Sequence, residues 1–175
     1  KGILDDKCKD VFEDFLFRLD SAGYDVKWEL LDAVHYRVPQ NRERVFIIGF
    51  RKDLCICYNF PQPTCYEAIT LDKALGDIKE EPTRYDDKES LKNNILRPNH
   101  DVLTSEFGSF YYQGNRRRGW NQPSFTIHAP AENIPLHPSS PKMMFYGHEN
   151  WNFQQDKLKD YRRLSVRECA RIQTF

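Results

Sequence analysis

Apolar residues recur at intervals of three and four between Cys8 and Leu19. This spacing predicts one face of an amphipathic helix. Asp5 and Asp6 precede the periodic stretch and are suitable caps for its first turn. Gly23 follows it and is a typical stop signal. The pattern therefore predicts a helix from about residue 6 to the residues just before Gly23.

Two strands are predicted after this helix. Val26, Trp28 and Leu30 alternate with charged residues, which is typical of a half-buried strand. The apolar run that starts at Val45 and is closed by Gly49 predicts a buried strand. A helix followed by two strands fits a layer of an α/β fold.

The pattern changes after Phe50, where prolines are spread through polar sequence. One short helix is predicted near Leu71 to Leu75, and the charged run 79–89 is predicted to be a solvated loop. Segment 121–127 has a short strand-like alternation. This half of the chain is therefore expected to be mostly β and irregular.

Three polar residues at alternate positions, Gln40, Arg42 and Arg44, come just before the second strand. On an extended chain they project to one side and place two guanidinium groups beside a carboxamide. Such a group suits a phosphate or a flat ring that bears a carbonyl. An edge strand with solvated arginines is the alternative.

A second basic group lies between two glycines and comprises Arg116, Arg117, Arg118 and Trp120. The flanking glycines allow the backbone to approach a polyanion closely, and the guanidinium groups can then reach phosphates or guanine edges. This segment is the candidate DNA-reading loop, with a solvated turn as the alternative. Thr126 and His128 are assigned to the same DNA-binding set.

The end of the chain predicts one more helix. Ser165 and Glu168 have the spacing of a capping box, so a helix should begin at about Val166.

Two blocks of the sequence, taken together, resemble motifs VIII and IX of the DNA cytosine-5 methyltransferases. They are the Gln-x-Arg-x-Arg block at Gln40 and the Arg-x-Leu-Ser-x-Arg-Glu-x-Ala-Arg-x-Gln-x-Phe block at Arg163. The resemblance implies an α/β fold. Residues 1–60 would form the C-terminal part of the S-adenosylmethionine-dependent methyltransferase sheet, 61–160 a small target recognition domain, and 161–175 the motif IX segment and the start of the returning helix.

The resemblance also implies roles for individual residues. Arg44 would contact the carbonyl of a flipped-out cytosine, Arg42 would brace the pocket and a nearby phosphate, and Gln40 would help to shape the loop. The motif IX residues are expected to be scaffold that ties the recognition domain to the catalytic core: Arg163, Ser165, Arg167, Glu168 and Arg171.

Other parts of the family's machinery have no counterpart in these 175 residues. The chain has no Pro-Cys dipeptide, which supplies the family's nucleophile, and no Gly-rich S-adenosylmethionine loop. We therefore expect a C-terminal fragment that is inactive alone, with S-adenosylmethionine bound by the missing part. The expected partners are double-stranded DNA and the remainder of the methyltransferase chain.

Composition restricts the alternatives. Lys+Arg and Asp+Glu both number 26, so any DNA affinity must come from local clusters. The five cysteines are an odd number, and Cys55-x-Cys57 with Cys65 lacks the second pair of a zinc site, so reduced thiols and no metal site are expected. No apolar run approaches the roughly 20 residues of a membrane span. The resemblance to DNA cytosine-5 methyltransferases implies a bacterial cytoplasmic, nucleoid-associated protein of a restriction–modification system.

Two other functions stay open: a DNA-binding specificity module without its own catalysis, and a tRNA cytosine-5 methyltransferase. The long arginine-bearing segment from Phe60 to Lys159 favours a reader of duplex DNA. The apolar residues Trp28 and Phe46 belong to a sheet that should be larger, so they are expected to be exposed and to promote self-association.

Overall fold

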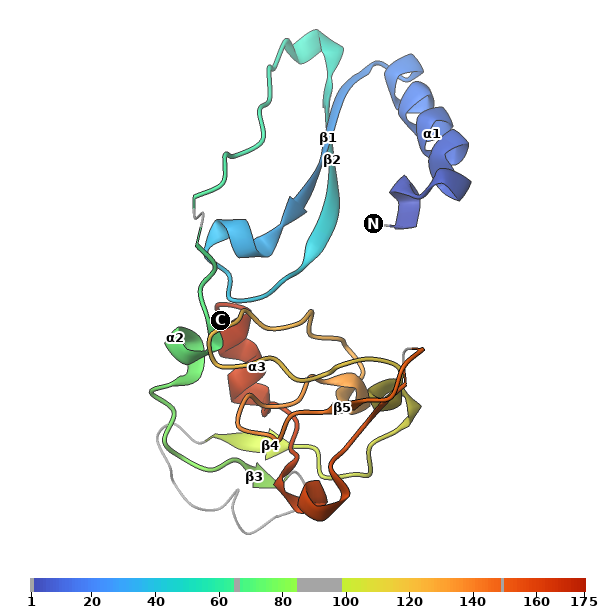
Figure 1. The fold of residues 1–175 in the computed structure, drawn as a ribbon. Helices are drawn as coiled ribbons and strands as arrows, with labels where there is room; N and C mark the ends of the chain where they lie inside the picture. Colours follow the sequence, from blue (N-terminus) through green and yellow to red (C-terminus); the bar gives the residue numbers. More distant parts are fainter. Residues whose placement is uncertain (1, 65–66, 85–98, 149) are drawn as a thin grey trace.

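The computed structural model describes residues 2–64, 67–84, 99–148 and 150–175 (Figure 1). An upper part carries the N-terminal helix and a long hairpin, and a lower part carries the later elements. The α-helices and strands are α1 (Lys9–Ser21), β1 (Tyr24–Asp32), β2 (Glu43–Arg51), α2 (Leu71–Leu75), β3 (Thr83–Arg84), β4 (His100–Val102), β5 (Met144–Phe145), β6 (Trp151–Asn152) and α3 (Val166–Ile172). Short 3-10 helices lie at Gly2–Leu4, Asp6–Cys8, Ala33–Tyr36, Lys52–Leu54, Ser109–Tyr112, Ala131–Asn133 and Gln155–Asp160. Of the helices in these described ranges, none combines the length and the apolar character needed to cross a membrane.

Helix α1 forms where the apolar periodicity predicts it, and Gly23 follows it with a φ of 91°. It begins later than predicted, because Asp6–Cys8 form a separate 3-10 turn and the Asp5 side chain makes no capping bond. Phe12 is the buried residue of the helix, and its ring meets Trp28 of β1 edge-on at 5.1 Å. The buried face is therefore narrower than the apolar pattern predicts.

Strands β1 and β2 form an antiparallel hairpin that pairs Asp32 with Glu43 at the loop end. Both predicted strands are confirmed. β2 is only half-buried, however, and not buried as predicted. The reason is that the sheet it forms with β1 contains no further strand within the described residues. Phe46 is 47% exposed and Trp28 is 43% exposed, as expected for a sheet that lacks further strands.

Two clusters of buried side chains form the core of the lower part. The first joins α2 to α3 and consists of Leu71, Ala74, Leu75, Leu164, Cys169 and Ile172. The second consists of Tyr111, Leu136, Met143, Phe153 and Tyr161. Helix α2 forms where it is predicted. Segment 161–164 contributes to both clusters and therefore connects them.

Regular strands are short in the lower part. β3 pairs with β4 in parallel, and β5 pairs with β6 in antiparallel orientation. Segment 121–127, with its strand-like alternation, contains only an isolated bridge from Ser124 to Gln40, so that expectation is wrong. Within the charged run predicted as a loop, Thr83–Arg84 form β3, while residues 85–89 lie outside the described part of the chain.

Arg163 is 1% exposed, and its guanidinium satisfies several polar groups of the lower part. It donates to the hydroxyl of Tyr111 at 2.9 Å and to the backbone oxygens of Leu103, Ser105 and Glu106 at 3.2, 2.8 and 3.0 Å. A buried charge costs free energy unless such partners surround it. Arg163 therefore fixes the course of segment 103–106.

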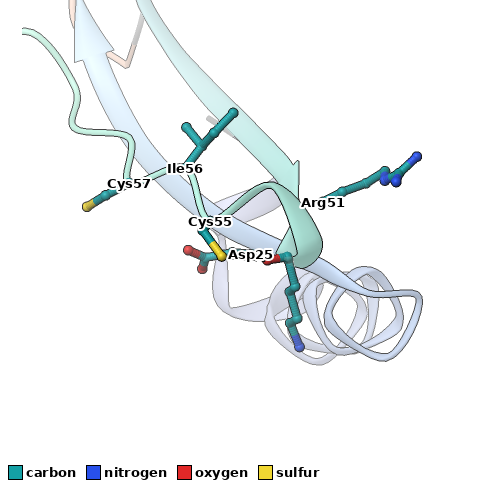
Figure 2. Close-up of a pocket in the computed structure, with 6 residues that line it drawn as sticks. Asp25, Arg51, Cys55, Ile56 and Cys57 are labelled. Atoms are coloured by element: carbon teal, nitrogen blue, oxygen red, sulfur yellow. Dashed lines mark hydrogen bonds between the residues drawn. The ribbon is translucent and has the colours of Figure 1, made fainter.

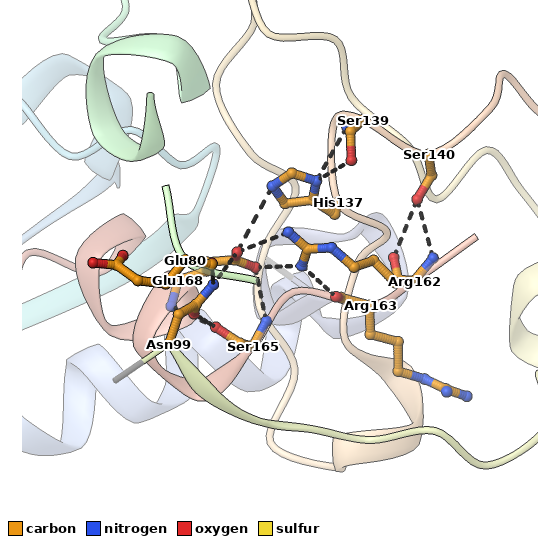
Figure 3. A network of polar contacts seen from close by, with 9 residues as sticks. All are labelled: Glu80, Asn99, His137, Ser139, Ser140, Arg162, Arg163, Ser165 and Glu168. Atoms are coloured by element: carbon orange, nitrogen blue, oxygen red, sulfur yellow. Dashed lines mark hydrogen bonds and ion pairs between the residues drawn. The ribbon is translucent and has the colours of Figure 1, made fainter. Parts of the chain in front are cut away.

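The carboxylate of Glu168 is the centre of a second buried network (Figure 3). The predicted capping box is confirmed, because the Ser165 hydroxyl accepts from the N–H of Glu168 and the carboxylate accepts from the N–H of Ser165. Arg162 donates to both carboxylate oxygens at 2.8 and 2.9 Å, and the Asn99 amide donates at 3.1 Å. Helix α3 starts at Val166 as predicted, with its first turn tied to distant segments.

His137 lies beside this carboxylate, with its Nε2 3.8 Å from Glu168 Oε1 (Figure 3). Burial and the positive charge of Arg162 lower the pKa of His137 to about 4, although Glu168 acts in the opposite direction. Burial would raise the pKa of Glu168, but the hydrogen bonds and charge of Arg162 outweigh it and lower the pKa. A neutral imidazole therefore packs beside a charged Arg–Glu pair.

The two other arginines of motif IX lie on the surface side of α3. Arg167 lies 3.7 Å from Glu80, and Arg171 pairs with Asp77 at 2.8 Å. The hydrogen bond from Arg171 lowers the pKa of Asp77. These contacts tie α3 to the segment that follows α2.

We predict that Arg163→Lys lowers the free energy of unfolding by about 3 kcal/mol in urea denaturation. An ammonium group cannot reach all four oxygens, and each lost charge-assisted hydrogen bond costs about 1.5 kcal/mol. Arg51→Lys is the matched control, since Arg51 forms an exposed pair with Asp53, and its effect should stay within about 0.5 kcal/mol. Equal effects of the two substitutions would contradict the role of Arg163 as a buried anchor.

We also predict that the free energy of unfolding falls by about 2 kcal/mol between pH 7.5 and pH 5 because of His137. The folded-state pKa of about 4 lies below the ordinary value of 6.5, so in this window the unfolded chain binds a proton that the folded chain does not. The contribution is complete above pH 6.5 and is lost as the pH falls toward 4. His137→Gln should remove this component, whereas His35→Gln, at an exposed position, should retain it. An unchanged pH dependence in His137→Gln would contradict this prediction.

Candidate functional site

Arg42 and Arg44 border a hollow of about 520 Å³ on one face of the β1–β2 hairpin. Its other walls are mainly apolar and include Leu31, Tyr36, Val38, Phe46, Ile48 and Phe60. Arg44 donates to the backbone oxygen of Glu43 at 2.6 Å, and Arg42 lies 3.5 Å from that of Ile127. Within the described residues neither guanidinium pairs with a carboxylate, so both retain donors for a ligand.

Gln40 does not share this face, which corrects the expectation that all three residues project together. It is fully buried, and neither polar atom of its side chain has a hydrogen-bond partner within the described residues. The N–H of Gln40 donates to the Val38 oxygen at 2.7 Å. Gln40 pairs with Ser124 of the lower part, and residues 41–42, which join it to β2, lie outside any strand. The alternation of an extended strand therefore does not reach Gln40.

Asp32, at the end of β1, holds the start of the arginine segment in place. Its carboxylate accepts from the N–H of Arg42 at 2.8 Å, from the N–H of Val34 at 3.3 Å, and from the Asn41 amide at 3.5 Å. One side chain therefore ties together both ends of loop 33–42. The sequence prediction missed Asp32, although an aspartate before a short turn is a typical acceptor for nearby N–H groups.

Loop 39–42 pairs with segment 124–127 of the lower part. The N–H of Asn41 donates to the Ser124 oxygen, and the N–H of Ser124 donates to the Pro39 oxygen, both at 2.9 Å. The Thr126 hydroxyl donates to the Asn41 oxygen at 2.7 Å. This pairing brings Thr126 next to Arg42.

A smaller hollow of about 220 Å³ brings together three of the predicted DNA-binding residues, Arg116, Thr126 and His128. The Arg116 guanidinium lies 3.7 Å above the Phe110 ring. His128 meets the same ring edge-on at 5.4 Å. Burial lowers the pKa of Arg116, which nevertheless remains charged at neutral pH. The three side chains thus form one cationic and polar surface.

Arg118 lies on this side as well, with its guanidinium 4.0 Å above the Phe125 ring. Its Nε is buried and has no hydrogen-bond partner among the described residues. Burial lowers the pKa of this guanidinium too. Phe125 also lines the smaller hollow, so Arg118 borders the surface formed by Arg116, Thr126 and His128.

Arg117 and Trp120 face a different direction. Arg117 donates to the backbone oxygens of Ser140 and Pro138 at 3.1 and 2.6 Å. Trp120 packs against the first core cluster and meets His137 edge-on at 5.2 Å. Because the chain is extended at the Arg117 bridge to Leu136, its neighbours 116 and 118 project to the opposite side. The structure therefore does not gather Arg117 and Trp120 with the other four predicted residues.

Of the four cysteines that the structure describes, none lines either hollow. Cys55 and Cys57 are exposed beside Asp25 and Arg51 in a separate hollow of about 350 Å³ (Figure 2). Burial raises the pKa of Cys169 to about 12, which makes it a poor nucleophile. The described residues contain no group of three His, Cys, Asp or Glu side chains that could hold a metal ion. Cys65, part of the possible zinc pattern, lies outside the described residues.

Comparisons with known proteins show the family to which the chain belongs. The family model for C-5 cytosine-specific DNA methylase matches residues 1–175. The Type II methyltransferase M.MthTI of Methanothermobacter thermautotrophicus is 44% identical over 153 residues, which cover 87% of this chain and 46% of that protein. The Type II methyltransferase M.FnuDI of Fusobacterium nucleatum is 38% identical over 178 residues, which cover 100% of this chain and 52% of that protein.

The chain thus spans about half the length of these relatives. A crystal structure described as a DNA modification methyltransferase encoded within an E. coli prophage superimposes with a TM-score of 0.56 at 20% identity. The superposition covers 98% of this chain and 56% of the other, and it shows a shared fold. Because the family model matches the chain over all of residues 1–175, the chain belongs to the family of C-5 cytosine-specific DNA methylases.

Proposed function

We propose that this chain is the target-recognition half of a DNA (cytosine-5-)-methyltransferase of a restriction–modification system. The complete enzyme would transfer a methyl group to carbon 5 of a flipped-out cytosine in a specific duplex site. The observation that supports this most is the pairing of loop 39–42 with segment 124–127. This pairing places Arg42 and Arg44, whose guanidinium groups pair with no carboxylate of the described residues, next to a second cationic surface.

The hollow at Arg42 and Arg44 suits the reacting base. A nucleophile that adds to carbon 6 of cytosine moves negative charge onto ring nitrogen 3 and the carbonyl oxygen at carbon 2. A guanidinium held at that oxygen stabilises the developing charge. In our proposal Arg44 has this role. Arg42, whose backbone N–H donates to the Asp32 carboxylate, braces the pocket and a neighbouring phosphate with its side chain.

The second surface suits the DNA on either side of that base. Arg116 and Arg118 present guanidinium groups that can make paired hydrogen bonds to guanine, each worth about 1–3 kcal/mol of discrimination. Thr126 and His128 add polar contacts on the same side. Extrusion of a base requires such contacts, because they offset the free energy of unstacking.

S-adenosylmethionine supplies the methyl group in this family, and we propose that residues outside this chain bind it. The large hollow does not fit that cofactor, because the sulfonium and ammonium groups of S-adenosylmethionine would meet two guanidiniums, and the described residues place no carboxylate in the wall. The nucleophilic thiol is also proposed to lie elsewhere, because none of the five cysteines follows a proline as the nucleophile of this family does.

The two faces of the hairpin suggest where the rest of the enzyme packs. Phe46, on the face that carries the large hollow, and Trp28, on the opposite face beside Phe12 of α1, both leave much of their side chains in contact with water. Apolar sheet faces of this kind need a cover. We propose that the remainder of the methyltransferase chain packs against both faces, and that the isolated 175-residue chain is inactive and self-associates. A cytoplasmic, nucleoid-associated location follows from the proposed substrate.

The proposal predicts that Arg44→Ala lowers kcat/KM for methyl transfer by about 100-fold in the complete gene product that contains this chain, because a donor to the developing oxyanion is lost. The assay measures transfer of labelled methyl groups to duplex DNA. Arg51→Ala, on the same strand but outside this hollow, is the matched control and should retain full activity. Full activity of Arg44→Ala would exclude the assigned role.

A second prediction concerns sequence choice. Arg118→Ala should reduce discrimination against sites with one substituted G·C pair by about tenfold, because one guanine contact is worth about 1–3 kcal/mol. Arg117→Ala is the comparison, since the Arg117 guanidinium is held by backbone oxygens. The folded fraction of the Arg117→Ala protein should keep the site preference of the wild type. An unchanged preference in Arg118→Ala would remove that residue from the reading set.

A further inference from the structure

One exposed arginine of the hairpin loop has an unusual backbone conformation. Arg37 has φ 64° and ψ 21°, in the left-handed region, and its side chain is exposed. Glycine, asparagine and aspartate adopt this region readily, whereas a long side chain adopts it at a cost. The conformation is set by the loop, because the N–H groups of Arg37 and Val38 both donate to the oxygen of Ala33 as the 3-10 helix ends.

The backbone gives no reason for an arginine at this position. Glycine or asparagine would end the turn with less strain. The side chain of Arg37 makes no hydrogen bond, ion pair or ring contact with the described residues. Positive φ values also occur at three other non-glycine residues of the described chain, Cys55, His148 and Thr174. Backbone strain alone therefore does not distinguish Arg37, whereas its charge and its position beside the large hollow do.

Arg37 stands between two residues of the wall of the large hollow. Its neighbours in sequence, Tyr36 and Val38, both line that hollow together with Arg42 and Arg44, and Arg37 itself is exposed beside them. Loop 33–44 therefore carries two arginines in the wall of the hollow and a third between two other wall residues. Among the described residues, no carboxylate pairs with the guanidinium of Arg37, Arg42 or Arg44. The nearby carboxylate of Asp32 instead accepts from backbone and amide N–H groups.

Unneutralised guanidinium groups around a concave site attract a polyanion. We propose that Arg37 is a further DNA-binding residue, which contacts a backbone phosphate of the duplex next to the flipped-out base. This inference rests on the proposed function. It assigns to Arg37 a charge contact that positions the DNA at the pocket and reads no base.

The test uses the complete gene product and measures its affinity for duplex DNA between 50 and 300 mM salt. Arg37→Asn keeps a residue that tolerates the left-handed conformation and removes the charge. Its Kd should rise several-fold near 0.1 M salt, and the slope of log Kobs against log salt should shrink by about 0.9, the value for one phosphate contact. The melting temperature should equal or exceed that of the wild type. Arg37→Lys should keep the wild-type slope.

Arg18→Asn is the matched control, because it removes the same charge from an exposed position on α1. Its slope should match that of the wild type. An unchanged Kd and slope in Arg37→Asn would overturn the inference while DNA binding by the wild type leaves the proposed function intact. A melting temperature lowered in both Arg37 variants would assign the residue to the fold and also overturn it. Failure of the wild type to bind duplex DNA would overturn the proposed function and this inference together.

Discussion

Two adjacent arginines that satisfy different buried groups hold the lower part of the structure together. Arg162 neutralises the carboxylate of Glu168 at the start of α3. Arg163 satisfies three backbone oxygens and the Tyr111 hydroxyl in the second core region. Short strands cannot supply a stable frame by themselves. The irregular chain between α2 and α3 therefore depends on buried charge–dipole contacts as well as on apolar packing.

The functional proposal depends on a separate constraint, the pairing of loop 39–42 with segment 124–127. The pairing joins Arg42 and Arg44, which we propose meet the reacting base, to the surface that we propose meets the surrounding duplex. Because Asp32 fixes the backbone of Arg42 from the other side, the two surfaces share one short, well-anchored loop. A substitution that moves segment 124–127 would therefore also move Arg42 at the large hollow.

Local features of the sequence predicted local structure well. The helices, the hairpin strands and the capping box at Ser165 follow from periodicity and from side chains that bond within a few residues. The alternation of side chains along an extended chain correctly predicted that Arg42 and Arg44 project to the same side. It failed for Gln40, which lies outside β2 and pairs with Ser124 of the lower part.

Features that arise from distant contacts were not predictable in this way. An arginine run gives no indication of which members face inward, and Arg117 turns to the backbone of Pro138 because of its bridge to Leu136. The role of Trp120 in the core likewise depends on partners far along the chain. The half-exposed state of Phe46 follows from the number of strands in the sheet, which no single segment encodes.

The measurement that tests the central claim most directly is methyl transfer by the complete gene product to two substrates, duplex DNA and tRNA, with labelled S-adenosylmethionine. The account predicts label at carbon 5 of cytosine in duplex DNA and none in tRNA. Label in tRNA alone would contradict the assignment of segment 116–128 as a reader of duplex DNA.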